Sequence, residues 1–219
     1  MDDLAGDHDQ VHRFEDQDGW PRNLYEYRPA NASCRAAPPV LLVHGNGCRY
    51  RVFAPAEGPG LAPFLARQGL HVFALELRGR GASLPEGRAA RMRALLRGWS
   101  VQEFMERDLP EAIQEIHRIT GAKQIDCIGH SLGGMLLIES LRGVVDGRVR
   151  RVVTVGSGDA QAMLSRDKDR SAKGQVDVAT VLLAMTLLVP YLPIHWAFSL
   201  AARRQGRIPD ALLMGLLDQ

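Results

Sequence analysis

The chain has 219 residues, a net charge of +2 and an ordinary share of apolar residues. This length suits one domain with a sizeable core, and so small a charge gives no reason to expect nucleic acid or an anionic surface as a partner. Cys34, Cys48 and Cys127 lie at unrelated spacings that match neither a zinc site nor a disulfide framework. Residues 1–7 are acidic and polar, unlike a signal peptide, so we expect a cytoplasmic protein with reduced thiols.

The first half of the sequence predicts strands alternating with a helix. Asp18-Gly19 indicates the loop of a hairpin, and the continuous apolar run at 40–43 is typical of a strand buried on both faces. Leu61, Phe64 and Leu65 are expected on one face of a helix that Gly69 stops. In chain order, the predicted elements are hairpin strands at 11–15 and 23–28, a strand at 40–43, a helix at 61–68 and a strand at 71–77.

The middle of the chain predicts a helical region after residues 85–99, a basic stretch that indicates no particular element. Ser100 and Glu103 have the spacing of a capping box, which begins a helix. Apolar residues then recur at helical spacing up to Gly121. Pro110 interrupts this pattern, so we expect a kink or two helices.

Residues 124–135 are the stretch around which the chain is organised. A short apolar strand at 125–128 runs directly into Gly-His-Ser-Leu-Gly at 129–133, and an apolar helical pattern follows up to Gly143. We expect Ser131 to lie strained at the turn between strand and helix, beside the positive end of the helix. A further apolar strand follows at 149–155, which completes the alternation that predicts a mostly parallel, doubly wound sheet.

The character of the sequence changes after Asp159. Residues 178–189 are apolar or Thr and end at Pro190, a run too short to span a bilayer. We therefore expect no transmembrane segment here, but a buried or interfacial helix. Residues 160–219 are rich in Leu, Met, Trp and Phe, which would suit an acyl chain, or equally the packing of helices over the core.

Three landmarks in order resemble an α/β-hydrolase: an apolar strand followed by His-Gly-x-Gly at 40–47, a strand followed by Arg-Gly-x-Gly-x-Ser at 75–83, and Gly-x-Ser-x-Gly-Gly at 129–134. The resemblance covers residues 12–158 and implies a hydrolase core at 1–158, with the start of a helical cap at 159–219. It is closest in kind to lipase- and esterase-like members. The sequence also resembles relatives of polyhydroxyalkanoate synthases, but these use Cys where this chain has Ser131, which favours a hydrolase.

The resemblance implies a role for each residue of these motifs. Ser131 would be the nucleophile that forms an acyl-enzyme, and the backbone amides of Asn46 and Leu132 would form the oxyanion hole. No metal or cofactor is implied. The residues expected to support the site are His44, Gly45, Gly47, Gly129, His130 and Gly133.

The acid and base of a Ser–acid–His triad are not evident. In the family order both follow Ser131, usually after further strands that this sequence does not show. After Ser131 the only histidine is His195, in an apolar stretch more typical of a lid or core residue, while Asp159 follows a strand end where a minority of relatives carry the acid. We therefore expect the C-terminal part of the enzyme to be missing and the strand at 149–155 to form a sheet edge.

The sequence leaves three functions open. The first is a serine hydrolase acting on a small-molecule carboxylic ester or thioester through Ser131. The second is a non-catalytic or truncated hydrolase-like protein that binds an apolar ligand or a partner chain, because the acid and base are absent. The third is an acyltransferase related to the polyhydroxyalkanoate synthases.

Overall fold

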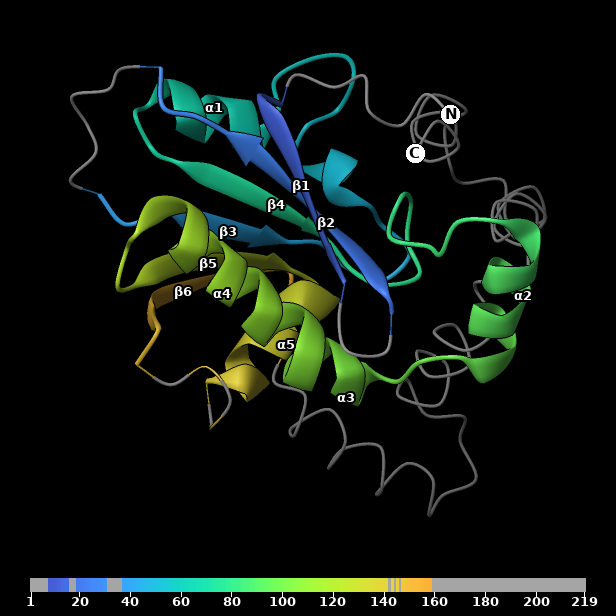
Figure 1. Ribbon diagram of the computed structural model, residues 1–219. Helices are drawn as coiled ribbons and strands as arrows, with labels where there is room; N and C mark the ends of the chain where they lie inside the picture. The colour runs from blue at the N-terminus through green and yellow to red at the C-terminus, as the bar shows by residue number, and fades with distance from the viewer. Residues whose placement is uncertain are drawn as a thin grey trace, which may run out of the picture. The chain divides into compact units, whose positions relative to one another are not determined.

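The computed structural model describes residues 8–15, 19–30, 37–141, 143, 145 and 147–158. Figure 1 shows this part as helices and strands. Asp159, His195 and the predicted cap at 159–219 lie outside the described residues.

Six strands form one sheet in the order β1-β2-β4-β3-β5-β6. The first two pairs in this order are antiparallel, and the three pairs among β4, β3, β5 and β6 are parallel. The predicted mostly parallel sheet is therefore confirmed. The strands are β1 (Gln10–Glu15), β2 (Pro21–Tyr27), β3 (Val40–Val43), β4 (Val72–Glu76), β5 (Ile125–His130) and β6 (Val149–Val155).

Burial along the strands follows their place in the sheet. Every residue of β3 and β4 is buried, as their continuous apolar sequences predict for central strands covered on both faces. Within the described residues β6 is an edge strand, and its Val153 and Val155 are 53% and 52% exposed. The edge position expected for this strand is confirmed for the part of the chain that the structure describes.

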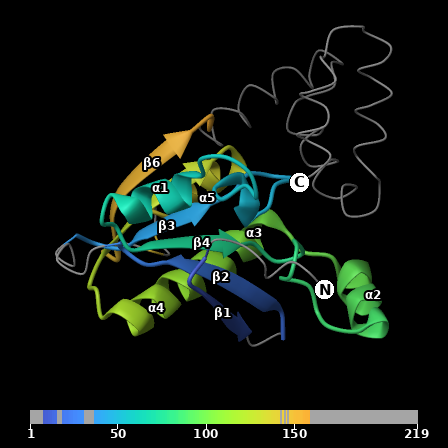
Figure 2. The ribbon, with the colours of Figure 1, turned by 90° about the horizontal axis from the view of Figure 1, so that it is seen from above.

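Helices cover both faces of the sheet, as Figures 1 and 2 show. Helices α4 and α5 pack with the residues of β3, β4 and β5 that face one side, and α1 packs against the other side. The helices are α1 (Leu61–Arg67), α2 (Arg88–Arg97), α3 (Val101–Glu103), α4 (Leu109–Thr120) and α5 (Leu132–Ser140), with a short 3-10 helix η2 (Tyr50–Val52) and a π-helical turn η3 (Phe104–Asp108).

The helix predictions hold in outline and differ in detail. The Ser100 capping box is present, and Pro110 lies in the first turn of α4, directly after the π-helical turn η3, so the helical run is divided there into α3, η3 and α4. In α1 the buried residues are Ala62 and Ala66, whereas Phe64 is 48% exposed. The predicted face was therefore wrong for Phe64, because small alanine side chains let α1 pack closely on the sheet. Helix α2 was not predicted.

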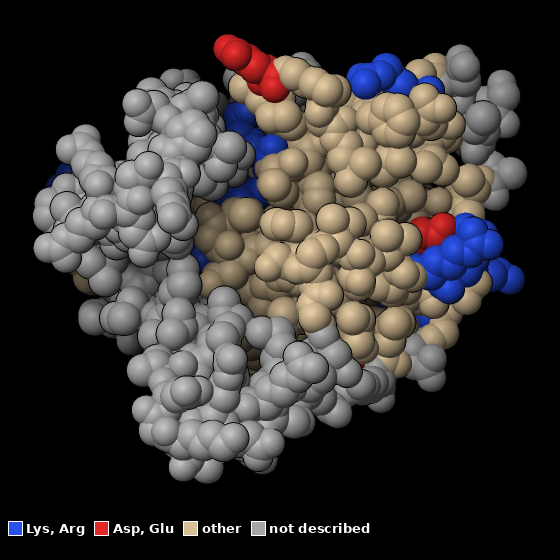
Figure 3. Space-filling view, turned by 180° about the vertical axis from the view of Figure 1, so that it is seen from behind, with Lys and Arg blue, Asp and Glu red and all other residues tan. Residues whose placement is uncertain are grey.

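Seen from behind, one face shows mostly uncharged side chains with a few acidic and basic groups at its margins (Figure 3). Within the described ranges, no helix has both the length and the apolar character needed to cross a membrane.

Candidate active site

Ser131 occupies a sharp turn between β5 and α5. Its backbone has φ 50° and ψ −118°, and within the described ranges it is the one non-glycine residue with positive φ. The Ser131 N–H donates to the carbonyl oxygen of Val155 on β6 at 2.9 Å, and the Ser131 carbonyl accepts from the N–H groups of Gly134 and Met135 in the first turn of α5. A side chain at this position lies at the positive end of the helix, where an anion is stabilised.

The turn is possible because the first turn of α5 lies against the ends of β3 and β5 with no side chain between the backbones. A β-carbon at Gly133 would collide with the backbone carbonyls of Val43 and His44 at the end of β3. A β-carbon at Gly129 would likewise collide with the backbone of Gly133 and Gly134. The close packing of β5, β3 and α5 therefore requires glycine at these positions.

The loop after β3 lies beside this turn. A β-carbon built on Gly45 would come within 3.0 Å of both Cβ of Ser131 and Nδ1 of His130. The next residue, Asn46, accepts a hydrogen bond at its Oδ1 from the Arg80 guanidinium at 3.1 Å. The structure thus brings together Ser131 and the His-Gly-Asn-Gly loop that the sequence singled out.

His44 is a buried anchor of this loop. Its Nδ1–H donates to the Gly45 carbonyl at 2.9 Å, and its Nε2 accepts from the Leu77 N–H at 3.2 Å. These two hydrogen bonds fix the neutral tautomer and leave neither nitrogen available to take a proton. Burial lowers the pKa of His44 to about 4, which agrees with a neutral ring. His44 therefore ties this loop to the residue after β4 and is not placed to act as a base.

The structure does not bring an acid and a base to Ser131 within the described residues. The Ser131 hydroxyl has no hydrogen-bond partner among them. The ring of His130 packs over Gly45, and its buried Nδ1 also lacks a partner. The two remaining candidates for acid and base, Asp159 and His195, lie outside the described ranges.

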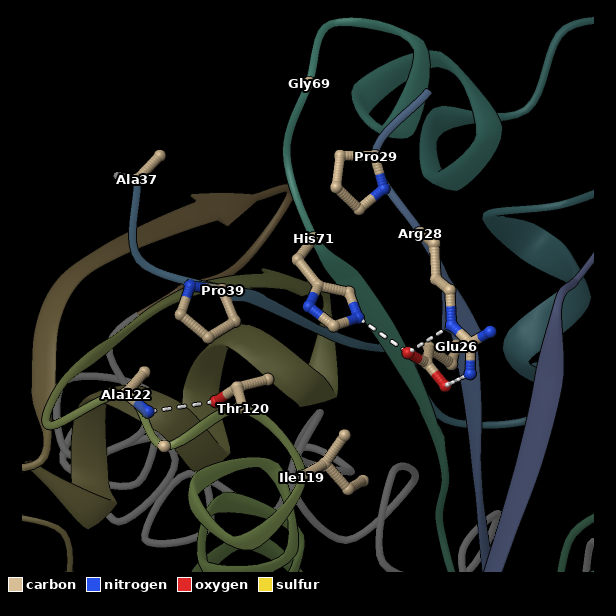
Figure 4. Close-up of a pocket in the computed structure, with 11 residues that line it drawn as sticks. Glu26, Arg28, Pro29, Ala37, Pro39, Gly69, His71, Ile119, Thr120 and Ala122 are labelled. Carbon is tan, nitrogen blue, oxygen red and sulfur yellow. Dashed lines mark hydrogen bonds and ion pairs between the residues drawn. The ribbon is translucent and has the colours of Figure 1, made fainter. Parts of the chain in front are cut away.

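A cavity of about 580 Å³ lies at the opposite end of the parallel strands, near the start of β4. Figure 4 shows the Glu26 carboxylate inside it, held by His71 and Arg28. The His71 Nε2 lies 2.7 Å from one carboxylate oxygen, and the His12 Nε2 lies 2.8 Å from the other. Hydrogen bonds from Arg28, His12 and His71 outweigh burial, so the pKa of Glu26 falls to about 2. The His71 ring is thus hydrogen-bonded to a buried carboxylate at this end of the sheet.

Two buried acids lie near the C-terminal end of β4: Asp108, which sequence reasoning missed, and Glu76, which it noted at a position where relatives often have Asp but gave no role. Asp108 accepts from the guanidinium groups of Arg22 at 3.0 Å and Arg78 at 2.8 Å, and all three side chains are fully buried. Glu76 ends β4 and is fully buried beneath the loop after β3. In the sequence, the sign that could have drawn attention to Glu76 was a single acidic residue at the end of an otherwise apolar strand.

The strand order, the strained Ser131 and the glycine-lined turn form the strand–turn–helix arrangement of a doubly wound, hydrolase-type sheet. The family model of the alpha/beta hydrolase fold matches residues 38–184, more than half of the chain. The chain belongs to the α/β-hydrolase family.

Individual relatives match parts of the chain. Triacylglycerol lipase 2 of Arabidopsis thaliana is 31% identical over 147 residues, which cover 63% of this chain and 34% of the lipase. An esterase from Rhodococcus sp. ECU1013 is 18% identical with a TM-score of 0.49, covering 68% of this chain and 46% of the esterase. A bacterial membrane phospholipase A is 18% identical with a TM-score of 0.47, covering 74% and 45%. The chain thus spans about a third of the curated lipase and less than half of these two solved chains.

Proposed function

We propose that this chain carries the nucleophile and the oxyanion hole of a serine hydrolase that acts on a carboxylic ester or thioester. The observation that carries the proposal is the contact of Gly45 with Ser131 at a turn of positive φ. A strained serine at a helix N-terminus, next to a glycine-rich loop, is the arrangement that acyl transfer to a hydroxyl requires.

The chemistry follows from these positions. The Ser131 hydroxyl attacks the acyl carbonyl, and the negative charge that develops on the carbonyl oxygen is stabilised by the backbone N–H groups of Leu132 and Asn46. The acyl C–O or C–S bond then breaks, the alcohol or thiol leaves with the proton taken from Ser131, and the acyl group stays on the Ser131 oxygen. Water, which gives up a proton in turn, hydrolyses this acyl-enzyme, releases the acid and regenerates the serine. A base must accept the hydroxyl proton, and Asp159 with His195 remain the candidates from this sequence.

The experiment is labelling with a fluorophosphonate, which reacts with an activated serine. We expect one modified peptide, containing Ser131, and loss of labelling in Ser131→Ala. Ser157→Ala is the matched control. The Ser157 side chain, after β6, lies close to Gly134 in the first turn of α5, and its removal should leave labelling unchanged. Labelling at another residue, or none in the folded chain, would contradict the proposal and favour a non-catalytic binding protein.

A substrate panel then separates hydrolysis from acyl transfer. Short aryl esters and thioesters are incubated with the chain, with and without an added alcohol as acceptor. Free acid as the dominant product is the result expected of a hydrolase. A transferred ester as the dominant product would instead favour the acyltransferase function.

A further inference from the structure

The oxyanion loop, residues 44–50, is held at both ends by the C-terminal end of β4. At its first residue, the His44 Nε2 accepts the N–H of Leu77. At its last residue, the N–H of Tyr50 donates to Oε1 of Glu76 at 3.1 Å. Asn46, the proposed oxyanion donor, lies between these two anchors. The position of its N–H relative to Ser131 therefore depends on both contacts.

Glu76 is an unusual choice for an anchor, because its carboxylate is fully buried and incompletely satisfied. Its Oε2 has no hydrogen-bond partner in the described part of the chain, and Nε of Arg49 lies 3.9 Å away from it. Its Oε1 lies 3.9 Å from Nε2 of His44, which carries no proton in the neutral ring and therefore donates no hydrogen bond to it. An apolar side chain would fill the same space without the penalty of burying a charge. A costly buried carboxylate beside a proposed reactive centre is the kind of group that function retains.

Six charged or titratable groups face Glu76 from the elements packed around it. Arg49, Arg51 and Arg80 favour its charged form, as does the hydrogen bond from Tyr50 N–H, whereas burial opposes it and prevails. The pKa of Glu76 is therefore raised to about 7. The groups are Arg49, Arg51, Arg80, Tyr25, Tyr50 and His44.

We infer that Glu76 is a positioning residue of the oxyanion loop, whose charged carboxylate holds the Tyr50 end of the loop and thereby places the Asn46 N–H against the oxyanion formed at Ser131. The inference rests on the proposed function. A carboxylate accepts a hydrogen bond from an N–H more strongly than a neutral carboxylic acid does. The loop is thus held more firmly when Glu76 is charged.

The experiment compares wild type with Glu76→Gln, which keeps the size and the acceptor oxygen but removes the charge. A donor that acts on the oxyanion alone changes kcat rather than KM. At pH 8 we expect kcat for a short aryl ester to fall about tenfold, less than the 10²- to 10³-fold typical of a donor that is lost outright. KM should stay within about twofold of the wild-type value. At pH 5.5 both proteins carry a neutral group, so the difference should disappear.

Glu26→Gln is the matched control. Glu26 is also a buried glutamate in this sheet, but it lies at the opposite end of the parallel strands. In Glu26→Gln, kcat calculated for the folded fraction should equal the wild-type value, and its dependence on pH should be unchanged. Glu76→Asp, which keeps the charge, should restore the pH dependence that Glu76→Gln loses.

The outcomes separate this inference from the proposed function. Failure of the fluorophosphonate to label Ser131 in wild type would contradict the proposed function itself. Labelled Ser131 with an unchanged pH profile in Glu76→Gln would overturn the role of Glu76 alone. If Glu76→Gln does not fold, Arg49→Gln replaces it. Loss of the Arg49 cation should move the Glu76 inflection in kcat to higher pH, and an unmoved inflection would overturn the inference equally.

Discussion

Gly45 lies so close to Ser131 that a β-carbon on Gly45 would stand 3.0 Å from the Ser131 Cβ. Gly45→Ala should therefore displace the loop that carries Asn46 by a few tenths of an ångström. We expect the rate of fluorophosphonate labelling and kcat to fall about tenfold or more, approaching the loss of one oxyanion donor. Gly143→Ala is the control, because a β-carbon at Gly143 meets nothing within 4 Å. Unchanged labelling of Gly45→Ala would place the oxyanion donors elsewhere.

The backbone of Ser131 predicts an unusual order of stability among its variants. A side chain at φ 50°, ψ −118° is strained, and the strain persists in Ser131→Ala but is released in Ser131→Gly. Glycine also loses more chain entropy on folding, which offsets part of the gain. We expect Ser131→Gly to be more stable than Ser131→Ala by about 1 kcal/mol in urea denaturation. A glycine variant of lower stability than the alanine variant would show that the turn is unstrained.

Because Asp108 is buried between two arginines, we expect Asp108→Asn to lower the free energy of unfolding strongly. Asp108→Asn removes the one charge that Arg22 and Arg78 share, so each buried guanidinium loses its fully buried ion-pair partner and keeps only a partly exposed one, Glu111 or Glu103. We expect a loss of about 3–5 kcal/mol in the free energy of unfolding. Asp126→Asn, which breaks the partly exposed ion pair with Arg150, should cost at most about 1 kcal/mol. Equal effects of the two variants would contradict the role of burial.

Much of this fold follows from patterns local in sequence. The apolar run of β3, the Ser100 capping box and the Gly-rich turn at Ser131 are short-range signals, and each appears where predicted. Contacts between distant residues carry no such signal. Nothing local marks Asp108 as the partner of Arg22, which lies 86 residues earlier, or Glu76 as the acceptor of the Tyr50 N–H. Among the predicted site residues, the structure brings together Gly45, His130 and Ser131, which follow or end β3 and β5. The acid and base, Asp159 and His195, stay predictions.

The Glu26 cluster predicts a loss of stability in acid. The pKa of Glu26 is about 2 in the folded chain, below its ordinary value of 4.5. Its contribution to stability is therefore complete above about pH 4.5 and disappears as the pH falls towards 2. The difference in urea midpoint between wild type and Glu26→Gln should be largest near pH 6 and vanish near pH 2. A difference independent of pH would show that the charge of Glu26 contributes nothing.

Glu76 predicts the opposite pH dependence. Its folded pKa of about 7 lies above the ordinary value of 4.5, so the folded chain keeps a proton that the unfolded chain releases. Wild type should lose stability relative to Glu76→Gln as the pH rises from 4.5 to 7, by about 3 kcal/mol in total. Urea denaturation at pH 5 and pH 8 measures this difference. A constant difference would mean that Glu76 has an ordinary pKa in the folded chain.

The hydrogen bonds from residues 44–50 to residues 76 and 77 restrict which segments could be exchanged between relatives of this protein. The two contacts that fix the loop ends join residues that are 26 and 33 positions apart in sequence, and each contact has one partner in each segment. Each contact joins a side chain, that of His44 or Glu76, to a backbone N–H. A chimera therefore keeps both contacts only if its loop supplies the histidine and its strand end supplies the glutamate. Grafting both segments together keeps the Leu77–His44 and Tyr50–Glu76 pairs intact, so the two segments form the smallest unit that can be exchanged as one.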